Sequence, residues 1–306
     1  MDCHEAAENI HRAHRDNQDM PEGDTIFRTA RSMGRALVGK PITGFRSNYP
    51  LLTRFHDDTP ITGQIVDRVE SRGKWLLIHF SGGATLVTHM LMNGSWHLYR
   101  QGERWLKPSR DMRIVLENRD YQAVAFTVPV ARIYTEQALA REKRIPPAGS
   151  DVLSGDFDPQ AAALRLRSYA QEEIGDVLLH QQVLAGVGNV FKSEVCFVEG
   201  VNPFRLVATL ADQQVAALIH TAQRLVAANV LEDSGGMIVT YRGQQRRTTH
   251  TSSPQESLWV YGRSGSPCRR CGDAIRHRLQ GPDARVTFWC QSCQPMPDGS
   301  NVDGLL

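Results

Sequence analysis

The chain has 306 residues, 41% of them hydrophobic and 22% charged, which is typical of a soluble globular protein with two domains and a small extra module. No apolar run approaches the ~18 residues of a membrane span, and residues 1–19 lack the apolar core of a secretory signal. These features argue against membrane and exported proteins, so we expect a cytoplasmic protein with no membrane partner.

Charge is distributed unevenly, although the formal net charge is only +2. Residues 1–19 carry two Arg and five acidic residues, whereas residues 242–293 carry nine Arg and three acidic residues, a net of +6. A basic region of this kind is expected where a protein binds phosphates. A merely solvated surface has the same composition, so charge alone does not decide between the two interpretations.

Residues 1–19 are polar and contain too few large apolar residues to fold on their own. We predict that they form a disordered extension or lie before the true start of the protein. Cys3, His4, His11 and His14 have metal-binding side chains, but a disordered tail explains them more simply.

Residues 20–143 contain one helical pattern followed by strand-like segments. The helix begins at Pro21 and ends at the Gly39-Lys40-Pro41 break, and later turns are predicted at Ser81-Gly82-Gly83 and Asn93-Gly94. Several short strands at this spacing indicate a β-sandwich or barrel. The predicted strands are Ile61–Val69, Lys74–Phe80, Thr85–Met92, Met112–Glu117, Val124–Val130 and Arg132–Tyr134.

The pattern becomes helical after a Pro- and Gly-containing segment, Arg144–Ser154, which we predict to be a linker. Residues 151–257 form the predicted helical domain, with a loop at 234–257. A cysteine module follows at 258–294, and residues 295–306 are predicted to be a disordered tail. The predicted helices are Pro159–Tyr169, Ile174–Leu184, Val190–Val198 and Leu210–Leu231.

Four of the six cysteines form two close pairs, Cys268-x2-Cys271 and Cys290-x2-Cys293. Each pair brings two thiolates to one tetrahedral Zn²⁺, and the eighteen residues between the pairs suit a β-hairpin. Because four thiolates complete the coordination, we expect one structural zinc ion that stabilises a module too small to bury a core. A redox-active double pair is the less favoured alternative.

A Gly-rich turn, Ala185-Gly186-Val187-Gly188-Asn189, joins two of the helical patterns. Gly186 and Gly188 permit a positive φ, and we predict that Asn189 caps the following helix. The free N–H groups at such a helix start suit one DNA phosphate. An ordinary turn between helices would have the same sequence.

Met20-Pro21-Glu22 begins the first helical pattern. If Met20 were the first residue, an aminopeptidase would remove it and expose Pro21 as a secondary amine, which can form a Schiff base with a sugar aldehyde. Glu22 would then shuttle protons. The alternative is an ordinary proline at a helix start.

Four motifs occur in one order: Pro21-Glu22-Gly23-Asp24, Ser71–Leu77 (SRGKWLL), the Gly-rich turn, and Tyr261-Gly262-Arg263 before the cysteines. Together they resemble the formamidopyrimidine-DNA glycosylase and endonuclease VIII family over residues 20–294. The resemblance implies an α+β multidomain fold with an N-terminal β-sandwich, a helix–two-turn–helix domain and a zinc finger. It also implies a monomeric, nucleoid-associated bacterial enzyme that binds damaged duplex or single-stranded DNA.

The resemblance assigns roles to individual residues. Pro21 is the expected nucleophile and Glu22 the general acid/base, while Lys74 is expected to assist β-elimination and contact a phosphate. Asn189 is expected to contact a phosphate, Arg285 to grip one and assist δ-elimination, and Arg263 to contact DNA. A solvated strand lysine is the alternative for Lys74.

A flipped base leaves a gap in the duplex that a side chain must fill. The loop from His89 to Gly94 resembles the family's wedge, and Met92 is the expected inserted residue; a core methionine at a strand end is the alternative. The hairpin Asp120–Thr127 lacks the Arg-Phe pair of the formamidopyrimidine branch. The chain therefore resembles the endonuclease VIII branch, whose substrates are oxidised pyrimidines.

Residues 1–19 conflict with catalysis by Pro21. While they remain attached, the Pro21 nitrogen is a tertiary amide and cannot attack a sugar. We therefore expect a bifunctional glycosylase and abasic-site lyase that starts at Met20 or loses its extension. The competing hypothesis is a catalytically inactive DNA-binding protein of the same fold. A zinc-ribbon transcription or translation factor would leave Pro21 and Lys74 without a role.

Overall fold

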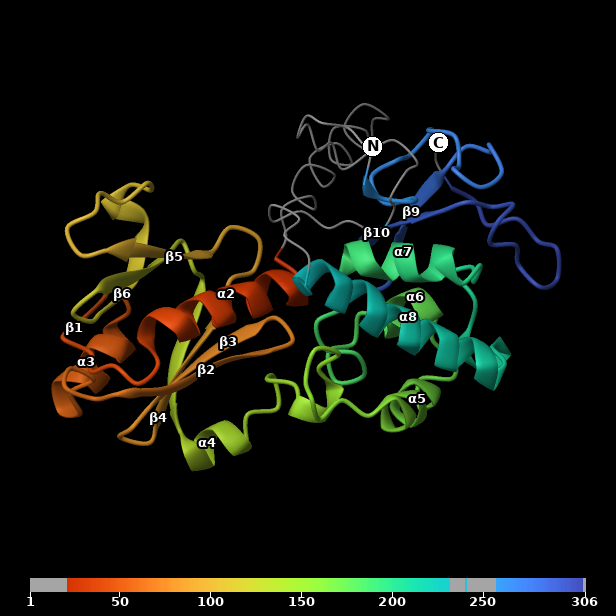
Figure 1. The fold of residues 1–306 in the computed structure, drawn as a ribbon. Coiled ribbons are helices and arrows are strands. Elements are labelled where there is room, and N and C mark those ends of the chain that lie inside the picture. Colours follow the sequence, from red (N-terminus) through yellow and green to blue (C-terminus); the bar gives the residue numbers. More distant parts are fainter. Residues whose placement is uncertain (1–20, 232–239, 241–256, 305–306) are drawn as a thin grey trace. The chain divides into compact units, whose positions relative to one another are not determined.

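The computed structural model describes residues 21–231, 240 and 257–304, which form two compact units (Figure 1). The first unit ends at Pro146 and the second begins at Pro147. Among the helices of these residues, none combines the length and the apolar character that crossing a membrane requires. The predicted extension, 1–19, and most of the predicted loop 234–257 lie outside the described residues.

The first unit contains two four-stranded antiparallel sheets with the orders β2-β3-β4-β8 and β1-β6-β7-β5. This architecture confirms the predicted sandwich. Its strands are β1 (Gly44–Ser47), β2 (Val66–Arg72), β3 (Trp75–Phe80), β4 (Ala84–His89), β5 (Ser95–Arg100), β6 (Met112–Glu117), β7 (Tyr121–Phe126) and β8 (Val130–Thr135); its helices are α2 (Gly23–Leu37), α3 (Pro50–Asp58), α4 (Glu136–Ala140) and η1 (Ser109–Asp111).

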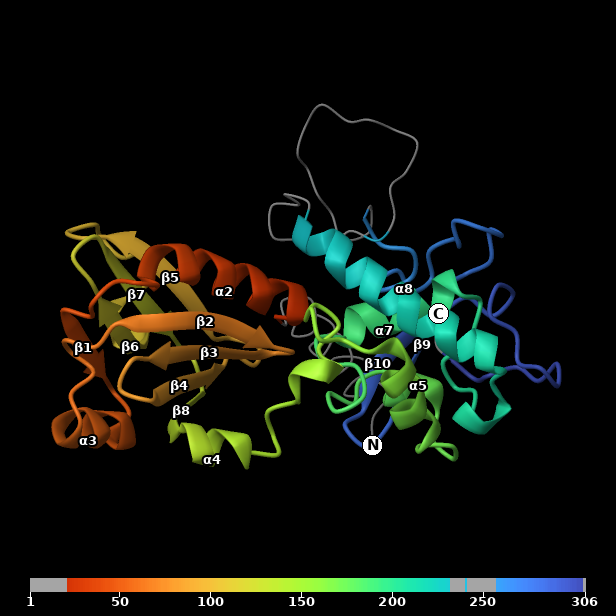
Figure 2. The ribbon, with the colours of Figure 1, turned by 60° about the horizontal axis from the view of Figure 1, so that its bottom comes forward.

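Alternating side chains of the strands build the core between the sheets. In β3, Leu76 and Ile78 point into the sandwich, whereas Leu77 packs on the other side against Leu139 and Ile145. Because both faces of β3 are covered, its sequence is a nearly continuous apolar run. Helix α2 buries its apolar face along the same core and runs beside β2 in both views (Figures 1 and 2).

Helix α3 was not predicted, and several strand ends differ from prediction. Pro50 occupies the first turn of α3, and Leu52 enters the core while Leu51 is 74% exposed. The pattern of α3 is therefore too short to be separated from the surrounding strands. The predicted strand Thr85–Met92 ends at His89, and the predicted strand Val124–Val130 is divided by a turn at Thr127, where φ is +51°.

The second unit is helical and surrounds its own core of aliphatic side chains. The predicted helix Ile174–Leu184 is limited to α6, because the Gln181 side chain bonds the backbone of the following turn instead. Its amide donates to the carbonyls of Leu179 and Val187 and accepts from the N–H of Gly186. The helices are η2 (Ala148–Ser150), α5 (Pro159–Arg167), α6 (Ile174–Val177), α7 (Asn189–Val198), η3 (Val207–Thr209) and α8 (Asp212–Leu231).

The predicted linker and the predicted C-terminal tail both contribute to the packing of the unit. Ser150 O accepts from Ala185 N at 2.8 Å, and Val152 N donates to Ala185 O at 3.1 Å, so the end of the linker is fixed to the Gly-rich turn. Within the tail, Val302 is 9% exposed and packs with Phe204 and Trp289.

The cysteine module contains the predicted hairpin, which confirms that expectation: β9 (Arg276–Gln280) pairs antiparallel with β10 (Arg285–Trp289). Side chains from the module, including Phe288, share a small core with Val190 and Phe197 of α7. The module therefore packs directly on the helical domain, and the two belong to one unit.

Candidate active site and metal centre

Pro21 and Glu22 lead directly into α2. Glu22 is the N-cap residue, and its carbonyl accepts from the backbone of Thr25 at 3.1 Å and Ile26 at 3.2 Å. Its side chain makes no capping bond although it is only 1% exposed. The Glu22 carboxyl is therefore held out of bulk water beside a half-buried Pro21, at the positive end of the helix dipole.

The next acidic residue, Asp24, has a structural partner. Its side chain is fully buried and pairs with Arg28 at 2.8 Å. Burial raises the pKa of Asp24, while the Arg28 guanidinium opposes that rise. The Asp24 carboxyl is therefore engaged in an ion pair within α2.

The β2–β3, β4–β5 and β7–β8 turns lie at one end of the sandwich. Trp75 pairs with His89, so the β2–β3 turn and the β4–β5 turn lie together, and His89 pairs with Val130 at the start of β8. Both ribbon views place the first turn of α2 beside the β2–β3 turn (Figures 1 and 2). Pro21, Lys74 and Met92 are therefore carried to the same end of the unit.

Lys74 lies in the two-residue turn between β2 and β3, not in the strand where we predicted it. Arg72 pairs with Trp75, which leaves Gly73, with a φ of +58°, and Lys74 as the turn residues. A two-residue hairpin with Gly first is a favoured geometry because its twist matches the strands. Lys74 thus stands at the tip of a hairpin, half-buried.

His89 was quoted in the predicted wedge loop but was given no role. Its ring packs edge-on against Trp75 at 4.8 Å, and its Nδ1 accepts a hydrogen bond from Leu91 N at 3.1 Å. Burial first, and then the charge of Lys74, lower the pKa of His89 to about 4. The ring is therefore neutral near pH 7, with its proton on Nε2, and it can donate to an anion beside Lys74.

Met92 is exposed on the β4–β5 turn. It is 37% exposed and Leu91 is 47% exposed, whereas Met90 is 2% exposed and belongs to the core. The alternative of a core methionine thus describes Met90 and does not describe Met92. A Cβ on Gly94 would lie 2.5 Å from Met90 O, so the tight turn requires glycine there.

Asn189 is the first residue of α7, and its side chain does not cap the helix as predicted. Gly188, which has a φ of −121°, is the N-cap residue. Of the two glycines in the turn, Gly186 has a positive φ, +97°, and Gly188 does not. The Asn189 Nδ2 group donates to Val286 O of β10 at 2.8 Å. Its Oδ1 is buried and has no hydrogen-bonding partner among the described residues. The side chain therefore connects the Gly-rich turn to the cysteine module.

Arg285 begins β10, next to the carbonyl that Asn189 binds, and is half-buried. Within the described part of the chain, its guanidinium has no hydrogen-bonding or ionic partner. Two residues later, Thr287 accepts a bond from Lys192 Nζ of α7 at 2.6 Å, and Lys192 is fully buried. Asn189 and Lys192 thus hold the strand that presents Arg285.

Glu194 of α7 is a fully buried carboxylate that our sequence analysis missed. It accepts hydrogen bonds from the backbone of residues 259–261 at 2.8, 2.9 and 2.9 Å, and from the Thr240 hydroxyl. Burial raises the pKa of Glu194, and these donors oppose the rise. The sequence pattern around Glu194 indicates that this residue is buried, but it does not indicate which groups the carboxylate binds. Glu194 fixes the chain entering the cysteine module.

Cys268, Cys271, Cys290 and Cys293 form a cluster whose sulfur atoms all lie within 4.8 Å of one another. The Cys268–Cys293 sulfurs are 3.8 Å apart and the Cys271–Cys290 sulfurs 3.4 Å. Tetrahedral Zn–S bonds of about 2.3 Å require sulfurs about 3.8 Å apart, so the four residues fit one metal ion. Cys196 lies outside the cluster, and burial raises the pKa of its thiol to about 12.

Arg263 is buried, and its guanidinium donates to the carbonyls of Trp259 and Pro267, the latter at 2.8 Å. These bonds close the loop that leads to Cys268. The geometry supports a role in shaping the module more strongly than the predicted contact with DNA.

Comparison with known proteins decides the family. The formamidopyrimidine-DNA glycosylase N-terminal domain matches residues 20–129, and the formamidopyrimidine-DNA glycosylase H2TH domain matches residues 148–240, together more than half of the chain. The chain belongs to the formamidopyrimidine-DNA glycosylase and endonuclease VIII family. This confirms the family and the fold that the motifs implied, and makes the chain an enzyme of the DNA glycosylase and abasic-site lyase class.

Relatives within the family are endonucleases 8. A probable endonuclease 8 2 of Streptomyces coelicolor is 36% identical over 281 residues, which cover 91% of this chain and 95% of that protein. The DNA-(apurinic or apyrimidinic site) lyase Nei2 of Mycolicibacterium smegmatis is 35% identical over 276 residues, covering 90% and 99%. The chain therefore lies in the endonuclease VIII-like branch.

Solved structures confirm the fold. The formamidopyrimidine-DNA glycosylase of Lactococcus lactis, solved non-covalently bound to DNA containing an abasic site, superposes with a TM-score of 0.72 at 23% identity. The match covers 90% of this chain and all of that one. At this identity the similarity concerns the fold alone.

Proposed function

We propose that this endonuclease VIII-like chain binds damaged DNA, removes oxidised bases, pyrimidines above all, and cuts the strand at the abasic site. The observation that supports the proposal most strongly is that Pro21-Glu22 begins α2 at the end of the sandwich where the Lys74 and Met92 turns also lie. The residues proposed as nucleophile, proton carrier, phosphate-binding cation and wedge thus all belong to one unit.

The Pro21 nitrogen is the proposed nucleophile. As a free secondary amine it attacks C1′ of the damaged nucleotide, and the base leaves with the electrons of the glycosidic bond. The opened sugar then carries an iminium group on Pro21. Loss of a C2′ proton expels the 3′ phosphate, a second elimination expels the 5′ phosphate, and water releases the proline.

Glu22 is the proposed general acid and base. Its carboxyl belongs to the residue next to Pro21 and is only 1% exposed, so a titratable group lies beside the proposed nucleophile. It would protonate the sugar ring oxygen as the ring opens and assist departure of the base. A buried position also keeps water from competing for those protons.

Lys74 and His89 are the proposed phosphate contacts of the first unit. A neutral His89 with its proton on Nε2 donates one hydrogen bond, and Lys74 supplies the charge. Arg285 and Asn189 are the proposed contacts of the second unit. The Arg285 guanidinium can bind a phosphate with two parallel hydrogen bonds.

Zn²⁺ is the proposed occupant of the four-cysteine cluster. Four thiolates leave no open coordination position, so the ion would supply folding energy and would activate no water. Cys268, Cys271, Cys290 and Cys293 would hold it, and the hairpin between the two pairs would thereby present Arg285.

Oxidised pyrimidines are the proposed substrates because the hairpin Asp120–Thr127 lacks the Arg-Phe pair of the formamidopyrimidine branch. The exposed Met92 is the proposed wedge that fills the space of the extruded base. Its sulfur-containing side chain is flexible and adapts to an irregular gap.

An inactive DNA-binding protein remains the competing function because the sequence continues before Pro21. An acylated Pro21 nitrogen has its lone pair delocalised into the carbonyl and forms no iminium.

Trapping with borohydride distinguishes the two functions. A protein that starts at Met20 and is processed to Pro21 should form a covalent adduct with abasic DNA when borohydride is added, whereas the uncleaved 306-residue chain should form none. Absence of an adduct from the processed protein would favour the inactive DNA-binding function.

A further inference from the structure

The second sheet of the sandwich carries an aromatic cluster on its outer face, away from the core. Tyr99, Val124 and Phe126 point outward from β5 and β7, and Trp105 from the β5–β6 loop covers them. The Trp105 ring lies edge-to-face with Phe126 at 5.7 Å, and its Nε1 donates to Gln122 Oε1 at 3.0 Å. The indole is therefore held in a fixed position on the sheet.

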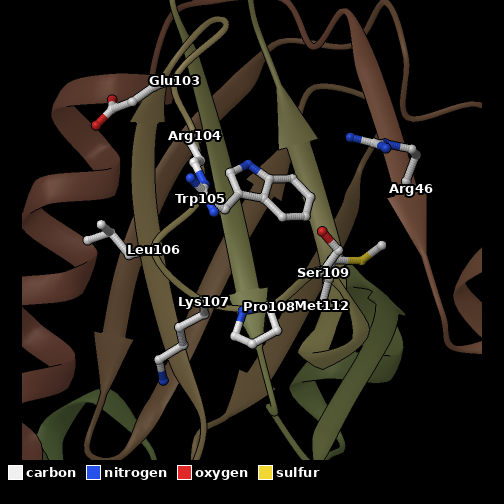
Figure 3. A pocket seen from close by; sticks show the side chains of 9 residues that line it. All are labelled: Arg46, Glu103, Arg104, Trp105, Leu106, Lys107, Pro108, Ser109 and Met112. Atoms are coloured by element: carbon white, nitrogen blue, oxygen red, sulfur yellow. The ribbon is translucent and has the colours of Figure 1, made fainter.

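A pocket of about 680 Å³ surrounds this indole and is lined by three cations, Arg46, Arg104 and Lys107 (Figure 3). The one acidic lining residue, Glu103, points away from Trp105 and accepts a bond from Arg100 N at 2.8 Å. The Arg46 guanidinium also pairs with Glu117 at 2.9 Å. Positive charge therefore predominates around an aromatic ring.

Arg46 lies over the Trp105 ring, and a stacked base would have to displace it outward. The Arg46 Cζ atom lies 5.9 Å from the centroid of the Trp105 ring. A base stacked between the two would need about two intervals of 3.4 Å, so the guanidinium would have to move outward by about 1 Å. The Arg46 side chain is 57% exposed and can make that shift.

The pocket is linked to the exposed turn that carries Met92. Lys107 Nζ donates to Ser95 Oγ at 2.9 Å, and Ser95 is the first residue after that turn. Thr127 N donates to Asp111 O at 2.8 Å, which ties the other end of the same loop to the β7–β8 turn. Both ends of the loop that lines the pocket are therefore bonded to the β4–β5 and β7–β8 turns.

We propose that this pocket binds an unpaired nucleotide, with the base stacked on Trp105 and the phosphate held by Arg104 and Lys107. Aromatic stacking combined with cations is how proteins hold single strands without sequence preference. A base inside a duplex is already stacked and cannot enter. The inference rests on the proposed function only in taking DNA as the partner, and it names a single-stranded segment beside the lesion as the source.

Fluorescence anisotropy of a labelled ten-nucleotide oligothymidine tests the pocket in the full chain. The oligonucleotide has no lesion, so the measurement does not depend on catalysis. Trp105→Leu should weaken binding at least about fivefold, since stacking of one base contributes ~1–3 kcal/mol. Arg104→Ala should lower the slope of log affinity against log salt by about 0.7. Arg54→Ala, which removes an exposed charge elsewhere on the unit, should change neither quantity.

Two further measurements keep the proposal distinct from a loss of folding. Trp105→Phe should retain affinity within about twofold, because a phenyl ring also stacks on a base. Competition identifies the source: displacement by unlabelled oligothymidine alone supports a strand, and equal displacement by dTMP supports a free nucleotide in the same pocket. Unchanged binding in both Trp105→Leu and Arg104→Ala would overturn the proposal.

Discussion

Burial and a neighbouring positive charge determine the protonation state of His89 in the first unit. His89 is pressed against Trp75 and lies near Lys74, and both effects disfavour its charged form. With Nδ1 already accepting from Leu91, only Nε2 can carry the proton. A histidine that stays neutral offers a phosphate a hydrogen bond without repelling Lys74, and the nearby lysine supplies the charge.

The pH dependence of stability tests this environment. Because folding lowers the pKa of His89 from 6.5 to about 4, the unfolded chain binds the proton more readily between these values. Stability is therefore unaffected above about pH 6.5 and falls as the pH drops, by up to about 3 kcal/mol near pH 4. In urea unfolding at pH 7.5, 6 and 5, His89→Gln should gain on the unmodified protein as the pH falls. A constant difference would contradict this explanation.

Replacement of Glu22 tests the proton shuttle. Glu22→Gln should lower the rate of base excision by about 10²–10⁴-fold, because a positioned acid or base contributes that much. Cleavage of preformed abasic sites should be less affected, since no base has to leave. Glu136→Gln, at the exposed start of α4, is the matched control and should change neither rate. Equal loss of both activities in Glu22→Gln would argue against a shuttle.

At the scale of elements, helix α7 joins the helical domain to the cysteine module. Asn189 and Lys192 bind β10, and Glu194 binds the backbone that enters the module. Three polar side chains in the first two turns of one buried helix therefore determine where the hairpin lies. The arrangement explains why α7 is polar at several positions although it is almost entirely buried.

Glu194→Ala should loosen the module. The substitution leaves three backbone donors of residues 259–261, two of them buried, without their acceptor, at about 1–3 kcal/mol for each buried donor. We expect the free energy of unfolding to fall by about 3 kcal/mol or more. Glu199→Ala is the control, because Glu199 accepts one bond, from Thr221 at 2.6 Å, and should cost about 1 kcal/mol. Equal losses in chemical denaturation would refute the special role of Glu194.

The sequence predicts elements well where one physical signal dominates. The spacing of several short apolar strands between turns identified the sandwich, and cysteine spacing identified the cluster whose sulfurs the structure brings together. The errors in the predicted elements come from side-chain hydrogen bonds within turns and from segments too short to show a pattern. Gln181 satisfies turn backbone groups and ends α6 early, and α3 offers only one deeply buried residue, Leu52. The roles of His89 and Glu194 depend on tertiary neighbours, so no local pattern could reveal them.

At the scale of the whole molecule, the proposed chemistry and the proposed DNA grip are divided between two units. Pro21, Glu22 and Lys74 belong to the first, whereas Asn189 and Arg285 belong to the second. Each motif alone had a plain structural explanation. The sequence therefore indicated the family only when all four motifs were considered in their order. In the structure, every motif begins a helix, forms a turn or leads into the four-cysteine cluster.

Arg285→Ala should weaken DNA binding and reduce its salt dependence. Removal of one phosphate contact lowers the slope of log affinity against log salt by about 1 for duplex DNA. Arg224→Ala, an exposed arginine of α8 in the same unit, is the control. Titration of an abasic duplex at several salt concentrations measures both. An unchanged slope in Arg285→Ala would contradict the proposed phosphate contact.

The central claim is that the ring nitrogen of residue 21 carries the sugar. Mass spectrometry of the borohydride-trapped, trypsin-digested adduct measures this directly. We expect the deoxyribose remnant on the peptide Pro21–Arg28, at its N-terminal proline, in protein that has lost every preceding residue. A remnant on a lysine, or an adduct on a chain that still begins at Met1, would contradict the account.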